Sequence, residues 1–208
     1  MGISCKMPTR EFVMRIIGSL LVLLFCASVA LAQPSPQEQV KRMVDDVLVI
    51  LNGSAAFETK KQQVSGMVQK YLGIHELAKR TLGIYWKQAS KEELAKFEKL
   101  YIRLLENTYL NRIGDYSGGR VDFLQERIKD DKAILDTLVV NDKMEIPVQY
   151  KMVLKDGVWE IYDVNIEGVS LIRSYRSSYG EIVRKDGFAG LFVQMEKKLS
   201  EAHLTDQQ

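Results

Sequence analysis

The sequence predicts an α+β protein in which helices pack on one face of a four-stranded, mainly antiparallel sheet. Three observations support this fold class. Apolar residues recur at helical spacing over residues 36–113, the spacing changes to the two-residue period of strands over 121–167, and helical spacing returns over 168–201. Helices that are separated along the chain from an antiparallel meander are typical of this class. The absence of an internal repeat or a low-complexity linker favours a single domain.

The start of the chain has the pattern of a secretory leader. Three basic residues within the first fifteen precede an apolar run at residues 16–31, and Ala30-Leu31-Ala32 fits an A-x-A cleavage site. We therefore expect residues 1–32 to be a cleaved signal peptide and residues 33–208 to form one domain. An uncleaved anchor is the alternative, because the apolar run is just short of a membrane span.

Composition excludes two classes of function for the expected mature chain. Both cysteines, Cys5 and Cys26, lie in the leader, which leaves neither a disulfide nor thiol chemistry. The formal net charge is +2, and the leader alone carries three basic residues against one acidic residue. A mature chain close to neutral lacks the clustered basic excess of a nucleic-acid-binding protein.

Four helices are expected before the sheet. Ser35-Pro36 supplies an N-cap and a first-turn proline for the first helix, which ends at Asn52-Gly53. Gly83 closes the short third helix, and a capping box from Ser90 to Glu93 begins the fourth. The expected helices cover residues 36–52, 56–72, 74–82 and 91–113.

The fourth helix, residues 91–113, carries an unusually broad apolar stripe. A stripe of this width can touch two packing partners, or one partner and a ligand. Ser117-Gly118-Gly119 is expected to end the helical segment. The stripe consists of Leu94, Phe97, Leu100, Tyr101, Leu104, Leu105, Tyr109 and Ile113.

Turn residues then divide the rest of the chain. Asp156-Gly157 is the pair typical of a type I′ hairpin turn, and Asn141-Asp142 marks another turn. Gly168 is expected to end the last strand and to begin a helix directly, and Lys185-Asp186-Gly187 separates this helix from a final one. The expected strands are 121–128, 134–140, 143–155 and 158–167, and the expected helices are 168–183 and 188–201.

No constellation in the sequence points to catalysis, a cofactor or a metal. Neither a nucleophile elbow nor a phosphate-binding or dinucleotide-binding glycine motif is present. His75 and His203 lack the partner ligands that a metal site requires. Asp163, on a strand beside tyrosines, is better explained by an orienting hydrogen bond to backbone or a tyrosine hydroxyl than by a role as general base.

Nine tyrosines follow the leader. Each combines an apolar ring with a polar tip, a combination that suits the mouth of a cavity whose ligand has an apolar tail and a polar head. Ordinary core and rim tyrosines are the alternative explanation.

Several segments together resemble a known family. They are the run from Asp156 to Arg176 (D-G-x-W-x-I-Y-D-V-x-I-E-G-V-S-L-I-x-x-Y-R), the segment Ala78 to Trp86, the long helix around Leu104 to Tyr109, Ile146 to Tyr150, and Asp186 to Leu191. In order and spacing they are similar to the MlaC / toluene-tolerance family of periplasmic phospholipid-binding transport proteins.

This resemblance implies a soluble periplasmic carrier with an apolar ligand cavity between sheet and helices. Such carriers move phospholipid between an outer-membrane lipoprotein–porin complex and an inner-membrane MCE-domain/ABC transporter complex, and so maintain outer-membrane lipid asymmetry. A hopanoid-associated branch of the family leaves hopanoid-type lipid as an alternative cargo. Two further alternatives are a ligand-free periplasmic assembly module and a hydrolase.

The cavity wall can be assigned to particular faces. Alternating residues of the third and fourth strands should share one sheet face, and the long helix should face them. The helix after Gly168 is expected either to move and admit acyl chains or to be a fixed cap on the sheet. The predicted lipid-binding residues are Tyr101, Leu105, Tyr109, Val148, Tyr150, Met152, Tyr162, Val164, Ile166, Val169, Ile172 and Tyr175.

Overall fold

A five-stranded antiparallel sheet and its helices make up the computed structural model, in which residues 34–111, 118–142 and 144–205 are described (side chains to 201). These residues belong to one compact unit, 34–208. The helices are α2 (Pro36–Asn52), α3 (Phe57–Gln69), α4 (Ile74–Leu82), the 3-10 turn η1 (Gly83–Lys87), α5 (Lys91–Leu110) and α6 (Leu171–Thr205). The strands are β1 (Arg120–Lys129), β2 (Lys132–Val140), β3 (Glu145–Lys155), β4 (Val158–Ile166) and β5 (Val169–Ser170), paired in sequence order.

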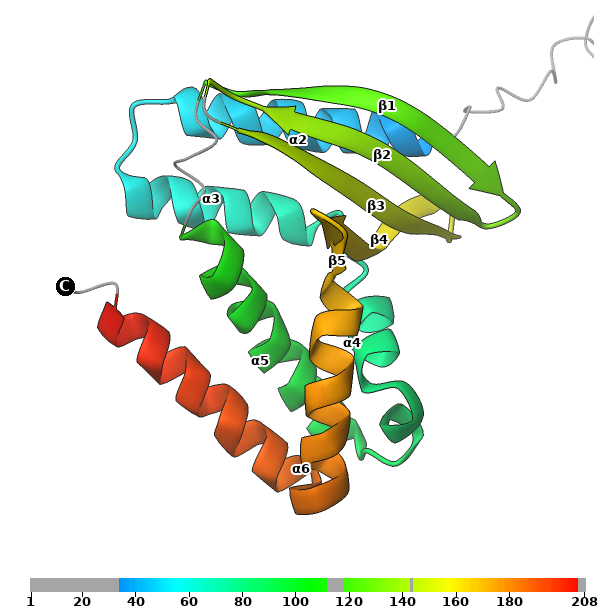
Figure 1. Ribbon diagram of the computed structural model, residues 1–208, viewed down its shortest axis with the longest axis vertical. Helices are drawn as coiled ribbons and strands as arrows, with labels where there is room; N and C mark the ends of the chain where they lie inside the picture. The colour runs from blue at the N-terminus through cyan, green and yellow to red at the C-terminus, as the bar shows by residue number, and fades with distance from the viewer. Residues whose placement is uncertain (1–33, 112–117, 143, 206–208) are drawn as a thin grey trace, which may run out of the picture. The chain divides into compact units, whose positions relative to one another are not determined.

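The predicted α+β class is confirmed, and local signals fix most of the helix ends. Ser35 and Glu38 form a capping box at the start of α2, and Ser90 and Glu93 form one at the start of α5. In Figure 1, α2 runs along β1 and β2, while α4, α5 and α6 lie together below the sheet. The expected signal peptide and the turn around Ser117 lie outside the described residues.

The sheet has five strands, so the prediction of four is wrong. Glu167 (φ 51°) and Gly168 (φ 84°) make a tight turn like that at Asp156 (φ 48°) and Gly157 (φ 82°). The chain therefore reverses and adds Val169–Ser170 as β5 against the end of β4. Glu-Gly is not one of the pairs that usually indicate a hairpin, so this turn was not predicted. Because Val169–Ser170 forms β5, α6 begins at Leu171 rather than at Gly168.

The two expected C-terminal helices are present as the two arms of α6. Gly187 (φ 67°, ψ −173°) interrupts the helical backbone, and the chain turns sharply there (Figure 1, orange and red). The φ value lies in the left-handed region that glycine adopts without steric strain.

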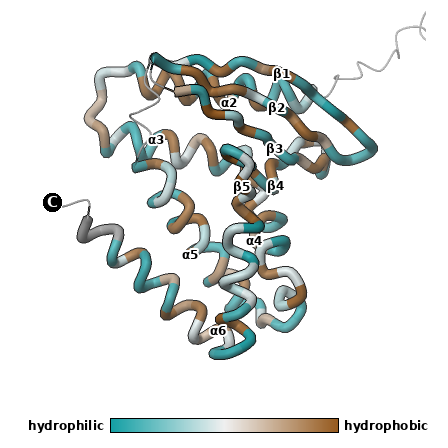
Figure 2. The backbone as a smooth tube through the Cα atoms, viewed as in Figure 1, coloured by the Kyte–Doolittle hydropathy of each residue, from teal (hydrophilic) through white to brown (hydrophobic). Residues whose placement is uncertain are grey.

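The buried side chains form two main clusters. One joins α4, α5 and α6 and includes Phe97, Tyr101 and Leu191. The other joins α2 to the sheet and includes Leu135 and Met152. Figure 2 shows hydrophobic and hydrophilic residues alternating along the strands and around the helices, as expected for elements with one buried face. Within the described part of the chain, no helix has the length and apolar character needed to cross a membrane.

Candidate functional site

A cavity of about 310 Å³, partly open to solvent, lies between the two clusters and is lined by α2, α3, α5 and the inner face of the sheet. Nearly all of its lining side chains are apolar. They include Met43, Val44, Val47, Leu48 and Leu51 of α2, Val64 and Val68 of α3, Ile102, Leu105, Tyr109 and Leu110 of α5, and Val121, Val139, Ile146, Val148, Tyr150, Val164 and Ile166 of the sheet, with Leu72, Leu77 and Leu171.

The sheet wall of the cavity matches the predicted face in part. Val148 lies opposite Ile166, and Tyr150 lies opposite Val164, so these four predicted residues share one face and line the cavity. Burial raises the pKa of the Tyr150 hydroxyl to about 12. The hydroxyl thus stays uncharged even in mildly alkaline solution and adds no charge to this wall.

Two other predicted residues do not line the cavity, Tyr162 because of a bulge in β4 and Met152 because it packs under α2. Lys151 pairs with Asp163 and Met152 with Ile161, which leaves Tyr162 as the extra residue of the bulge. The ring of Tyr162 lies 4.0 Å below the guanidinium of Arg80 instead of in the cavity. Met152 is fully buried in the cluster between α2 and the sheet, so it fills the core rather than bordering the cavity.

The α5 wall contains Leu105 and Tyr109 but not Tyr101. Tyr101 is 1% exposed and stacks on Phe97, and its hydroxyl accepts a hydrogen bond from Thr81 Oγ1 at 3.1 Å. Tyr175 packs edge-on against Tyr101, with ring centroids 5.3 Å apart, and borders a separate hollow of about 250 Å³. Tyr101 and Tyr175 thus connect helices, whereas Tyr109, 37% exposed, lies at the rim of the cavity.

The start of α6 meets the cavity through Leu171 alone, since the two predicted residues beside it point elsewhere. Val169 is 57% exposed on β5. Ile172 is buried, and its backbone N–H donates to Asp163 Oδ1 at 3.2 Å. Of the twelve predicted residues, the cavity is lined by Leu105, Tyr109, Val148, Tyr150, Val164 and Ile166.

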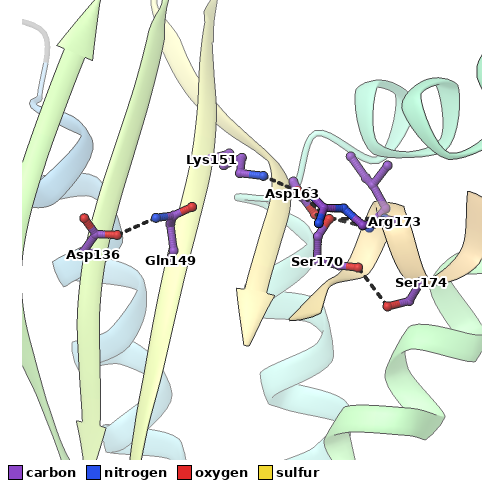
Figure 3. Close-up of polar contacts among 8 residues, drawn as sticks. Asp136, Gln149, Lys151, Asp163, Ser170, Arg173 and Ser174 are labelled. Carbon is purple, nitrogen blue, oxygen red and sulfur yellow. Dashed lines mark hydrogen bonds and ion pairs between the residues drawn. The ribbon is translucent and has the colours of Figure 1, made fainter. Parts of the chain in front are cut away.

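Asp163 has the orienting role predicted for it, although its partners are not tyrosines (Figure 3). Its carboxylate accepts hydrogen bonds from Ser170 Oγ at 2.8 Å and from Lys151 Nζ at 2.9 Å. Ser170 Oγ in turn accepts from the backbone N–H of Arg173, in the first turn of α6. These bonds tie the start of α6 to β3 and β4, which favours the fixed-cap interpretation of this helix over a hinge at Gly168.

Few polar side chains line the cavity. Gln69 Nε2 donates to Glu106 Oε1 at 2.6 Å, and Ser65 Oγ donates to the same oxygen. These residues join α3 to α5. Among the described residues, no group of three or more His, Cys, Asp or Glu side chains is placed to hold a metal ion.

The sequence prediction missed the contribution of α2 and α3. The apolar stripe of α2 was visible in the sequence, but periodicity shows only that a face is covered and not whether side chains or a cavity cover it. A weaker signal was the polar sequence of α3, and in the structure this helix buries only Val64. A helix with so little apolar packing cannot fill the space beneath it.

Comparison with known proteins assigns the fold to a family. A family model described as MlaC protein matches residues 41–197. The chain belongs to the MlaC family. A relative of this MlaC-family chain is the Haemophilus influenzae intermembrane phospholipid transport system binding protein MlaC, 24% identical over 148 residues, which are 66% of this chain and 67% of the relative.

A solved structure supports the same fold. The phospholipid-binding protein from Ralstonia solanacearum, determined in complex with a phospholipid, superposes with a TM-score of 0.74. It is 22% identical to this chain, and the match covers 80% of this chain and 98% of the other. Both proteins are described as binding proteins.

Proposed function

We propose that this protein is a periplasmic lipid carrier that holds the acyl chains of a phospholipid in the cavity between α2, α3, α5 and the sheet. In this proposal residues 1–32 direct secretion and are removed, and residues 33–208 form the lipid-binding domain. The observation that carries the proposal is a cavity of about 310 Å³ with an almost wholly apolar lining, in a member of the MlaC family.

The physics of lipid transfer explains why such a cavity suffices. Each buried CH₂ group contributes about 0.8 kcal/mol, so a lipid with two long chains scarcely enters water unaided. A carrier needs an apolar cavity in which the free energy of the bound lipid is close to its free energy in the membrane and not much lower. Catalytic groups are unnecessary for this task.

We further propose that the six lining residues predicted from the sequence contact acyl chains, together with the apolar side chains of α2 and α3. The cavity is at the lower end of the range of about 300–1,000 Å³ typical of ligand sites. Two full chains therefore require the walls to separate. The wall with the least apolar packing is α3, which buries only Val64.

The proposed partners follow from the family. We propose that the loaded protein moves between an outer-membrane lipoprotein–porin complex and an inner-membrane MCE-domain/ABC transporter complex. Crosslinking in cells, followed by identification of the captured membrane proteins, tests this step separately from lipid binding.

Lipid binding is tested by organic extraction and mass spectrometry of protein purified from cells that express the full sequence. We expect about one phospholipid per protein. A hopanoid in its place would change the cargo but leave the carrier role. Protein that carries no lipid and takes none from vesicles would contradict the proposal and favour a ligand-free assembly module.

A further inference from the structure

One end of the cavity faces solvent, and it lies where α2 ends and β1 begins. The backbone N–H of Gly118 donates to Asn52 Oδ1 at 3.4 Å, which brings these two ends together. The last residue of α5, Leu110, packs in a small cluster with the same end of α2. Tyr109 and Arg120 line the cavity at this end, and both are exposed. We call this end the mouth.

The opposite end is closed by buried side chains that belong to the two main clusters. Leu77 of α4 and Leu171 of α6 are part of the cluster that joins α4, α5 and α6, and Met43 is part of the cluster between α2 and the sheet. All three line the cavity and are buried, and Leu77 is the most deeply buried at 2% exposed. Val164 of β4 packs against both clusters and connects them here. We call these four residues the floor.

Three lining segments extend from the mouth to the floor, and their lengths give the depth of the cavity. They are residues 43–51 of α2, residues 102–109 of α5 and residues 146–150 of β3. The rise per residue of helices and strands makes these segments about 12, 10 and 14 Å long. In a membrane, each leaflet provides half of a hydrocarbon core that is about 30 Å thick, or about 15 Å. The cavity is therefore slightly shallower than the space that a leaflet gives to a long acyl chain.

We propose that the floor sets an upper limit on the length of the acyl chains that the carrier accepts, and that Leu77 fixes this limit. This inference rests on the proposed carrier function. Separation of α3 from the other walls would widen the cavity, but it would leave the depth unchanged, because the floor residues belong to α2, α4, β4 and α6. The preferred cargo is thus a phospholipid with chains of short to intermediate length, whatever its head group.

The thermodynamics of transfer from a membrane makes such a limit sharp. A methylene that fits the cavity exchanges one apolar environment for another, so it changes the transfer free energy little. A methylene that does not fit stays in water or forces close-packed side chains apart. The loss of its burial makes transfer about fourfold less favourable. Uptake should therefore depend weakly on chain length up to the limit and fall steeply beyond it.

The experiment uses protein purified from cells that express the full sequence. The protein is incubated with vesicles that contain equal amounts of four phosphatidylcholines, each with two identical monounsaturated chains: myristoleoyl, palmitoleoyl, oleoyl or eicosenoyl. The common head group leaves chain length as the variable, and the double bonds keep the vesicles fluid. Once the composition of the bound lipid is constant, mass spectrometry compares it with the vesicles. We expect a fall of at least about fourfold between neighbouring members of the series beyond the limit.

Leu77→Ala removes Cγ, Cδ1 and Cδ2 from the floor and should move this fall to the next longer member of the series. Leu82→Ala is the matched control, because Leu82 lies on the same helix and in the same cluster, is equally buried at 2% exposed, and does not line the cavity. It should lose stability in the same way but keep the wild-type profile. Val164→Phe adds volume at the floor and should move the fall to the next shorter member, which keeps the inference testable if Leu77→Ala does not fold.

Three results would overturn this inference and leave the carrier function standing. They are equal uptake of all four lipids by the wild type, the same profile change in Leu77→Ala and Leu82→Ala, and an unaltered profile in Val164→Phe. A wild-type protein that takes up none of the four lipids would overturn the carrier function and this inference with it.

Discussion

Two residues of β4, three positions apart, allow the cavity to be distinguished from ordinary core. Val164 lines the cavity and is half-buried, whereas Ile161 is 1% exposed within the close-packed cluster under α2. We consider the substitution of each by glutamate. At Val164 the new carboxylate reaches a space that water can fill, and at Ile161 it has no such space.

The expected magnitudes differ accordingly. Ile161→Glu buries an unpaired charge and should lower the free energy of unfolding by more than about 4 kcal/mol, a large part of the 5–15 kcal/mol typical of a domain. Val164→Glu loses mainly the burial of the valine side chain, about 1–2 kcal/mol. Lipid entry would then have to strip water from the carboxylate at Val164, and a penalty of about 3 kcal/mol weakens binding by more than about 100-fold.

The assay combines urea denaturation with uptake of a fluorescent phospholipid from vesicles. Val164→Glu should unfold near the wild-type midpoint and take up almost no lipid, while Ile161→Glu should be unfolded or nearly so. The reasoning fails if Val164→Glu is destabilised as strongly as Ile161→Glu, because Val164 would then belong to the dry core. It fails equally if a folded Val164→Glu protein takes up lipid normally.

Three further predictions concern stability. Asp163→Asn weakens the bonds from Ser170 and Lys151, and urea denaturation should show a loss of about 2–3 kcal/mol. Gly83→Ala should lower Tm, because Gly83 has φ 58° and a Cβ there would lie 2.7 Å from the guanidinium of Arg176, with a loss of at least about 1–2 kcal/mol. The third prediction concerns alkaline pH: burial raises the pKa of Tyr150 to about 12, so above about pH 10 the unfolded chain loses a proton that the folded chain keeps. Tyr150 alone should therefore lower stability by up to about 3 kcal/mol between pH 10 and 12. Burial raises the pKa of Tyr101, Tyr109 and Tyr179 as well, so Tyr150→Phe should reduce the slope without removing it.

Features encoded within a few residues were predictable from the sequence. The capping boxes at Ser35 and Ser90 and the turn at Asp156-Gly157 depend on hydrogen bonds and φ preferences that neighbouring residues determine. For the same reason the helix and strand boundaries needed only small adjustments. The break at Gly187 between the two arms of α6 was found because glycine is the residue that adopts this backbone conformation freely.

The missed features depend on contacts between distant segments. β5 exists because Val169–Ser170 finds an open edge at the end of β4, which no short sequence pattern announces. The bulge at Tyr162 did leave a trace, since the inward apolar residues change from Trp159 and Ile161 to Val164 and Ile166. An alternation that changes parity within one strand indicates an inserted residue, and attention to it would have removed Tyr162 from the predicted wall.

The arrangement of the core explains how such a fold can keep an apolar cavity open. Close-packed side chains stabilise α4, α5 and α6 among themselves, and a separate set stabilises α2 on the sheet. The cavity lies between these clusters, and α3 forms one of its walls. This helix contributes Val64 to a small third cluster, and its Ser65 and Gln69 donate hydrogen bonds to Glu106 of α5. Because neither main cluster depends on the cavity being filled, losing the ligand exposes apolar surface without removing the contacts that hold the helices and the sheet. A carrier must empty and refill without unfolding, and a core divided in this way meets that requirement.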